Sequence, residues 1–195
     1  MKIALFDFDG TISSKDSLVE FIKYAVGEKA YYVGILKLSP LLVGFILKLV
    51  KNDIAKEKLF SYYFKGWNHS SFTNVAVEYS QKQIKNIVRP KAVEKIKWHL
   101  RQGHDVVVVS ASMESWLEAW CDGMKIGLIA TKLEVVDGKI TGNFISKNCH
   151  GAEKVERINE IYNLFEYDYV YAYGDSGGDK EMLTLADESF YKPFR

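Results

Sequence analysis

The chain has 195 residues, of which 48% are apolar and 26% are charged, and its formal net charge is +1. This length fits one α/β domain with a sizeable insertion. A net charge close to zero argues against nucleic acid as a partner, because phosphate backbones are bound by a strongly basic face. The two cysteines, Cys121 and Cys149, are too far apart for a Cys-x-x-Cys pair, so we expect a reduced, cytoplasmic protein.

The chain begins with a short apolar run, Ile3 to Phe6, that is typical of a buried parallel strand and ends in Asp7 and Asp9. Alternate residues of a strand point to the same side, so both acids are expected to face one pocket. Burying two neighbouring carboxylates costs on the order of several kcal/mol unless a cation or a proton neutralises them. The structural alternative is an acidic turn in which Gly10 supplies a permissive backbone.

Residues from about 14 to 88 are predicted to be entirely helical. Asp16 or Ser17 is expected to cap the first helix, because apolar residues recur at helical spacing after them. Two further helical patterns cover residues 53–65 and 70–87.

Residues 29–51, here called the apolar hairpin, are the most apolar part of the chain. The uncharged run between Lys37 and Lys48 is ten residues long, whereas a membrane span needs roughly 20. Pro40 is expected to break the helix. We therefore predict two short helices of a buried hairpin and no transmembrane span. The functional alternative is an apolar lid that touches a lipid substrate or lies on a bilayer.

The rest of the chain alternates between strands and helices. Helices are predicted from Pro90 to Leu100, from about Met113 onward and over residues 151–164. Strands are predicted over residues 105–110, 127–131 and 169–173 and near residue 190. A β-hairpin is predicted around Asp137-Gly138. The alternation implies an α/β fold with a doubly wound (Rossmann-like) parallel sheet. We expect residues 1–13 plus 89–195 to form this core domain and residues 14–88 to form an inserted all-helical domain.

Three predicted strands end in polar side chains, which are Asp7 and Asp9, Ser110 and Ser112, and Asp175 and Asp179. In an open parallel sheet these ends share one edge, where such folds bind ligands. Several acids in one crevice need a hard cation, and ligation by oxygen alone suits Mg²⁺. The hydroxyl of Ser110 and the free N–H groups of the following helix suit a phosphate.

Chemistry at such an edge follows from its groups. One carboxylate beside a metal and a phosphate could attack phosphorus and form an aspartyl phosphate. A second acid two residues further on could protonate the leaving alcohol and then activate water. A cation is still needed to hold the phosphate against these acids, and Lys154 at the start of its helix is the best candidate.

Four segments together resemble the motifs of the haloacid dehalogenase superfamily of phosphatases. They are Asp7-Phe8-Asp9-Gly10-Thr11, Val109-Ser110, Lys154 and Gly174-Asp175-Ser176-Gly177-Gly178-Asp179. They occur in the family's order and extend over nearly the whole chain.

The resemblance implies a role for each of these residues. Asp7 would be the nucleophile and Asp9 the general acid and base. The phosphoryl group would be bound by Thr11, Ser110 and Ala111 and neutralised by Lys154. Mg²⁺ would be held by the Asp7 carboxylate, the Asp9 backbone carbonyl and Asp175, supported by Asp179. An Asp at position 9 favours phosphatase over dehalogenase chemistry.

The helical insertion is similar to the cap of the phosphoserine-phosphatase-like branch, subfamily IB. Asp16 lies where serine-specific members carry an acid that contacts the substrate amine, although a helix N-cap is an equal alternative. The segment around Lys154 differs from those members, so Lys147 is the second candidate for the phosphate-neutralising lysine. Alternatively, Lys147 is a solvated loop residue with no role in the site.

The resemblance leaves the substrate open. A small phosphorylated metabolite such as phosphoserine is the first expectation. The apolar hairpin with Pro40 also resembles a bacterial phosphatidylglycerophosphate phosphatase of the same branch, which makes a lipid phosphate, and with it peripheral membrane contact, the alternative. We give less weight to two other functions than to a phosphatase. One is a phosphomutase or phosphotransferase, and the other is a non-catalytic phospholigand-binding protein. The sequence predicts no oligomeric state.

Overall fold

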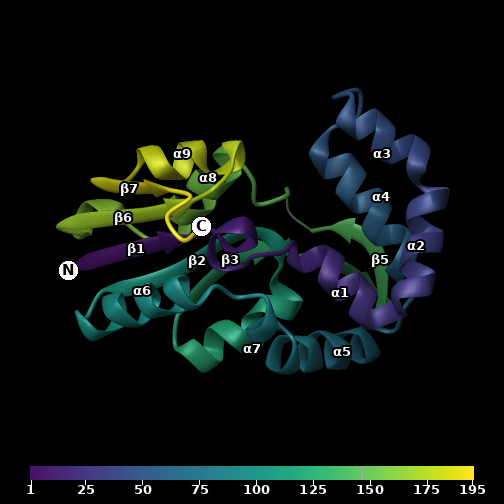
Figure 1. Cartoon of the computed structure of the whole chain (residues 1–195), viewed down its shortest axis with the longest axis horizontal. Coiled ribbons are helices and arrows are strands. Elements are labelled where there is room, and N and C mark those ends of the chain that lie inside the picture. The colour runs from purple at the N-terminus through teal and green to yellow at the C-terminus, as the bar shows by residue number, and fades with distance from the viewer. Residues whose placement is uncertain (146) are drawn as a thin grey trace.

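The computed structural model describes residues 1–145 and 147–195, with a parallel sheet at one end and a group of helices at the other (Figure 1). The five-stranded sheet has the order β3-β2-β1-β6-β7, and every neighbouring pair is parallel. Its strands are β1 (Lys2–Phe6), β2 (Asp105–Met113), β3 (Gly127–Thr131), β6 (Tyr169–Gly174) and β7 (Glu188–Tyr191). The predicted doubly wound parallel sheet is confirmed.

Helices cover both faces of this sheet, α6 (Pro90–Arg101) and α7 (Glu114–Met124) on one and α8 (Ala152–Ile161) and α9 (Lys180–Thr184) on the other (Figure 1). The residues of β1 alternate between two apolar clusters. Phe6 packs in the cluster that holds Trp116 of α7, whereas Leu5 packs in the cluster that holds Ile158 of α8 and Met182 of α9. Because both faces are buried, β1 is apolar from Ile3 to Phe6.

The helical group is formed mainly by the segment between β1 and α6. It contains α1 (Ser17–Val26), α2 (Glu28–Lys37), α3 (Ser39–Ile46), α4 (Asn52–Phe64), α5 (His69–Lys82) and a short 3₁₀ turn (Ile84–Asn86). The chain leaves and re-enters the sheet region at adjacent points, where Ser13 and Val88 form an antiparallel bridge. These crossings lie at the predicted boundaries, and the division into two domains there remains our proposal.

A β-hairpin from the second half of the chain also packs against these helices. Its strands β4 (Leu133–Val136) and β5 (Lys139–Phe144) are antiparallel and are joined by Asp137 and Gly138. Both turn residues have positive φ, 49° and 71°, which is the signature of a type I′ turn. Ile140 exchanges backbone hydrogen bonds of 2.8 and 2.9 Å with the turn after α4. The predicted hairpin is confirmed, and it connects the helical group to β3.

The apolar hairpin consists of two short helices, as predicted, but it is not buried. Pro40 lies in the first turn of α3, and α2 and α3 meet at an angle of 67°. Leu36 and Ile46 are each 74% exposed and Leu49 is 80% exposed. The expectation of a buried hairpin is therefore wrong. None of the described helices is by itself long and apolar enough to cross a membrane; only the bent pair α2 and α3 passes that test together, on length and composition.

Candidate active site

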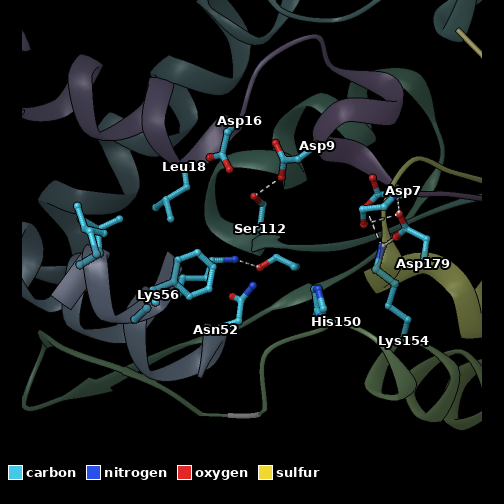
Figure 2. A pocket seen from close by; sticks show the side chains of 16 residues that line it. Asp7, Asp9, Asp16, Leu18, Asn52, Lys56, Ser112, His150, Lys154 and Asp179 are labelled. Carbon is cyan, nitrogen blue, oxygen red and sulfur yellow. Dashed lines mark hydrogen bonds and ion pairs between the residues drawn. The ribbon is translucent and has the colours of Figure 1, made fainter. Parts of the chain in front are cut away.

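A cavity of about 290 Å³ lies between the carboxyl edge of the sheet and the helical insertion (Figure 2). The sheet side contributes Asp7 and Asp9, which follow β1, and the end of β2. The loop and helix after β6 contribute Asp179, and α8 contributes Lys154. The structure thus brings together acids that are up to 172 positions apart, at the edge that the strand ends predicted.

Asp7 is held in place on its backbone and on both carboxylate oxygens. Its N–H donates to the carbonyl of Tyr173 at 2.9 Å, which continues the β1–β6 pairing by one residue. Asp7 Oδ1 accepts from Lys154 Nζ at 2.7 Å, and Oδ2 accepts from Thr11 Oγ1 at 3.0 Å. Burial raises the pKa of Asp7 to about 7, although the charge of Lys154 opposes this shift.

Lys154 is the buried cation of the site. It lies in the first turn of α8 and is 1% exposed. Its Nζ donates to Asp7 Oδ1, Asp179 Oδ1 and the Val109 carbonyl, each at 2.7 Å. Burial alone would lower the pKa of Lys154, but the two carboxylates outweigh it and hold the pKa above its ordinary value. The ammonium therefore stays charged beside Asp7.

The second candidate lysine, Lys147, lies elsewhere. Its side chain is 79% exposed, and its Nζ is 3.8 Å from carboxylate oxygens of Glu153 and Glu156. This placement favours Lys154 for the phosphate-neutralising role, which remains a prediction.

The Asp9 carboxylate points away from Asp7 and toward the insertion (Figure 2). Its Oδ1 accepts from the N–H of Ser17, the first residue of α1, at 2.6 Å, and its Oδ2 accepts from Ser112 Oγ at 2.5 Å. Burial raises the pKa of Asp9 to about 6, and the negative charge of Asp16 adds to the shift. Asp16 itself caps α1, since Oδ1 accepts from the N–H of Val19, and it also lines the cavity.

Three carboxylates form a group that could hold a metal ion. One oxygen each from Asp7, Asp175 and Asp179 lies within 4.8 Å of the other two. An all-oxygen donor set of this kind fits Mg²⁺. Asp179 Oδ2 also accepts from the N–H groups of Asp175 and Ser176, at 3.1 and 3.0 Å, which fixes the loop.

The chain makes room for this group at Gly10. A Cβ at Gly10 would lie 2.5 Å from Asp175 Oδ2, and Gly10 has a φ of +87°. A side chain there would therefore collide with Asp175 and strain the backbone. The guanidinium of Arg195 forms an ion pair with the same Asp175 carboxylate.

At the end of β2, the hydroxyl that lines the cavity belongs to Ser112, whereas we expected that of Ser110. Ser110 is fully buried, and its Oγ accepts from the N–H of Ser112 at 3.0 Å. Ala111 and Ser112 line the cavity. The phosphate-binding roles of Ser110 and Ala111 remain predictions, and Ser112, which bonds to Asp9, was expected at this edge from the sequence but was given no role.

Lys56 on α4 is a cavity residue that sequence reasoning missed. Its ammonium donates to the Ala111 carbonyl and lies 3.4 Å from Asn148 Oδ1. Burial lowers the pKa of Lys56. Asn52, Lys56 and Leu59 all line the cavity, and their spacing of four and three residues places them on one helix face. Their helical spacing could have shown that these three residues share a face of the helix, but it does not show that this face lies opposite the carboxylates of the sheet edge.

Apart from Asp16, Asn52 and Lys56, the insertion side of the cavity is apolar. Its lining side chains are Leu18 of α1, Leu42 and Phe45 of α3, and Ala55 and Leu59 of α4. A charged sheet edge thus faces an apolar wall across one cavity.

Two sequence relatives match almost the whole chain. Protein CicA of Caulobacter vibrioides is 32% identical over 99% of this chain and 86% of its own length. A probable phosphatase of Mycobacterium tuberculosis is 30% identical over 92% of this chain and 64% of its own length. The match to CicA is long enough to show shared ancestry over the whole fold.

Solved structures share the fold. A Bordetella pertussis protein of unknown function superposes with a TM-score of 0.84 at 21% identity, covering 96% of this chain and 88% of that one. A substrate-bound phosphoserine phosphatase superposes with a TM-score of 0.69 at 20% identity, covering 97% and 85%.

The model of the haloacid dehalogenase-like hydrolase family matches residues 4–184, which contain all four of the motif segments. The family resemblance read from those segments is confirmed. The chain belongs to the haloacid dehalogenase-like hydrolase family.

Proposed function

We propose that this protein is a Mg²⁺-dependent phosphomonoester hydrolase that works through an aspartyl phosphate on Asp7. The observation that carries the proposal is the buried Asp7 carboxylate, held by Lys154 and Thr11 beside two further acids at the base of a cavity. A binding module has no need of a carboxylate held in this way. The similarity to a protein described as a probable phosphatase, and in fold to a phosphoserine phosphatase, supports the same activity.

In the first step an Asp7 oxygen attacks the phosphorus of the substrate. The ester P–O bond breaks, and Asp9 gives its proton to the leaving oxygen. The raised pKa of Asp9, about 6, keeps a fraction of this acid protonated near neutral pH. The Lys154 ammonium balances the negative charge that gathers between Asp7 and the phosphoryl oxygens.

In the second step a water molecule attacks the phosphorus of the aspartyl phosphate. Asp9, now ionised, accepts a proton from this water, and the bond between Asp7 and phosphorus breaks. Inorganic phosphate leaves, and both carboxylates return to their starting states. A phosphomutase or phosphotransferase would use the same intermediate and pass the phosphoryl group to an alcohol instead of water.

Asp7, Asp175 and the Asp9 backbone carbonyl would hold Mg²⁺, and Asp179 would orient the Asp175 loop through its hydrogen bonds. The bound ion supplies positive charge that offsets the repulsion between phosphate and carboxylates. Because the Arg195 guanidinium forms an ion pair with the same Asp175 carboxylate, metal binding there would compete with this ion pair.

Two observations bear on the substrate. Asp16 and Lys56 place one acidic and one basic side chain in the cavity, which supports a small substrate that carries both an amine and a phosphate, such as phosphoserine. The apolar wall formed by Leu42, Phe45 and Leu59 favours instead an ester with an apolar group, the lipid-phosphate alternative.

Both cysteines are free and buried, in keeping with our proposal of a reducing, cytoplasmic location.

Phosphate release with and without Mg²⁺ tests the proposal, on a panel of phosphoserine, sugar phosphates, nucleotides and an aryl phosphate. Asp7→Asn is expected to abolish turnover because an amide cannot attack phosphorus. Asp122→Asn, an exposed change on α7, is the matched control and is expected to leave turnover unchanged. Turnover near the wild-type rate in Asp7→Asn contradicts the nucleophile assignment. A phosphoenzyme that persists until an alcohol is added identifies a phosphotransferase.

A further inference from the structure

The apolar hairpin carries a concentration of exposed apolar side chains. Eight of the sixteen large apolar side chains that the structure describes as exposed lie in it. They are Tyr32, Val33, Leu36, Val43, Phe45, Ile46, Leu47 and Leu49. The hairpin forms the outer end of the molecule, on the side away from the sheet (Figure 1). So many exposed apolar side chains on one short segment point to an interaction site.

The charges of the apolar hairpin have one sign. Among residues 29–51 there is no Asp or Glu, and the charged residues are Lys29, Lys37, Lys48 and Lys51. All four lysines are exposed. Apart from Glu28 at the first position of α2, the charges on α2 and α3 are positive. Exposed lysines among apolar side chains complement an anionic lipid surface, which attracts basic groups while the apolar side chains enter the interface. Two copies of the same surface would bring like charges together, which disfavours a second copy of this chain as the occupant.

The apolar hairpin is continuous with the catalytic cavity. Leu42 and Phe45 of α3 line the cavity that contains Asp7, and Phe45 is also 39% exposed. Together with Leu59 they form an apolar wall that leads from the exposed surface to the sheet edge. A ligand with an apolar chain could follow this wall while its phosphate reaches the charged edge.

We propose that the apolar hairpin docks on an anionic lipid bilayer and that the cavity takes an amphiphilic phosphomonoester from that surface. The helices α2 and α3 lie on the bilayer, because their 67° bend and short lengths suit an interfacial rather than a crossing arrangement. The substrate's acyl part rests against Leu42 and Phe45, and its phosphate faces Asp7. The choice of substrate rests on the proposed phosphatase function, whereas the docking surface does not.

Vesicle flotation tests the docking. The wild-type protein is expected to float with vesicles that mix phosphatidylglycerol and phosphatidylcholine, and much less with phosphatidylcholine alone. The triple variant Leu36→Ser, Ile46→Ser, Leu49→Ser removes exposed side chains outside the cavity lining and is expected to lose binding roughly tenfold or more. Phe165→Ser, at an exposed apolar residue beyond α8, is the matched control and should bind as wild type.

A second variant tests the charges of the apolar hairpin. Replacing three of its lysines (Lys37→Gln, Lys48→Gln and Lys51→Gln) should weaken binding to anionic vesicles and reduce the salt dependence of that binding.

Kinetics separate docking from chemistry. The triple serine variant is expected to lose turnover of phosphatidate in vesicles but to keep wild-type turnover of a soluble aryl phosphate. Wild-type protein that ignores anionic vesicles, or a serine variant that binds them equally well, overturns the proposal. Self-association without vesicles that the serine variant abolishes assigns the surface to a second copy and also overturns it. Vesicle binding without hydrolysis of any phosphate would instead refute the proposed function and leave the docking surface intact.

Discussion

The two walls of the cavity differ in how their side chains are held. On the sheet wall, Asp7, Lys154 and Asp179 are buried, and Lys154 donates a hydrogen bond of 2.7 Å to each of the two carboxylates. On the insertion wall, Leu42 and Phe45 have no polar group and belong to a hairpin that is largely exposed. The contrast indicates that the sheet edge determines the reaction and that the insertion determines which substrate reaches it. Changes on the sheet wall should therefore lower kcat, whereas changes on the insertion wall should alter KM or substrate preference.

After the loss of the nucleophile itself, the largest effect is expected at the buried lysine. Lys154→Met removes the charge that stabilises the phosphoryl oxygens beside Asp7, and we expect kcat to fall about a hundredfold or more. Steady-state phosphate release measures this loss. Lys147→Met is the matched control, because Lys147 is an exposed lysine in the loop before the same helix. A loss in Lys147→Met and none in Lys154→Met would reverse the assignment of the two lysines.

A smaller loss is expected at the proposed metal site. Asp175→Asn keeps the side-chain shape but removes one negative charge from the group of three acids. The Mg²⁺ concentration that gives half-maximal turnover should rise roughly tenfold or more. A Mg²⁺ titration of phosphate release measures this, with Asp122→Asn again as the control. An unchanged Mg²⁺ requirement would exclude Asp175 as a ligand.

On the insertion wall, Lys56→Met should act mainly on binding. The Lys56 ammonium is the positive charge that the insertion contributes to the cavity lining. Its loss is expected to raise KM for an anionic substrate about tenfold, with a smaller change in kcat. Lys58→Met, on the exposed side of the same helix, is the control and should have wild-type kinetics. A fall in kcat with unchanged KM would place Lys56 with the reaction and not with substrate selection.

The smallest effect is a shift in pH dependence. The negative charge of Asp16 is one cause of the raised pKa of Asp9, so Asp16→Asn should lower that pKa. Asp9 must be protonated to donate in the first step, so the alkaline decline of kcat should move to lower pH, by about one unit or less. Asn also caps helices well, so α1 should remain folded. A pH–rate profile measures the shift, and an unchanged profile would contradict coupling between the two acids.

Much of the sheet wall was predictable from the sequence, because its signals are local. An apolar run that ends in Asp7 and Asp9 indicates both the strand and the edge where it stops. The same pattern recurs before Asp175, and parallel pairing then brings the strand ends together. The helix that begins two residues before Lys154 could also be read from its periodicity.

The insertion wall was less predictable, because its contacts depend on which helix faces meet. An apolar pattern reports that α2 and α3 are helical but not whether another element covers them, so the predicted burial was wrong. For a related reason Lys56 was missed, and Ser112 was expected at the sheet edge but was given no role. Their roles come from contacts to Ala111 and Asp9 that are 55 and 103 positions away in sequence.

The most direct test of the account is to trap the covalent intermediate. Enzyme mixed with substrate and Mg²⁺ is quenched in acid, reduced with borohydride and mapped by mass spectrometry, so that an aspartyl phosphate appears as homoserine. We predict homoserine at position 7 in the wild-type protein and in the serine variant of the apolar hairpin supplied with a soluble substrate. Turnover without modification at Asp7, or modification at another acid, would contradict the claim that the sheet wall carries the reaction through Asp7.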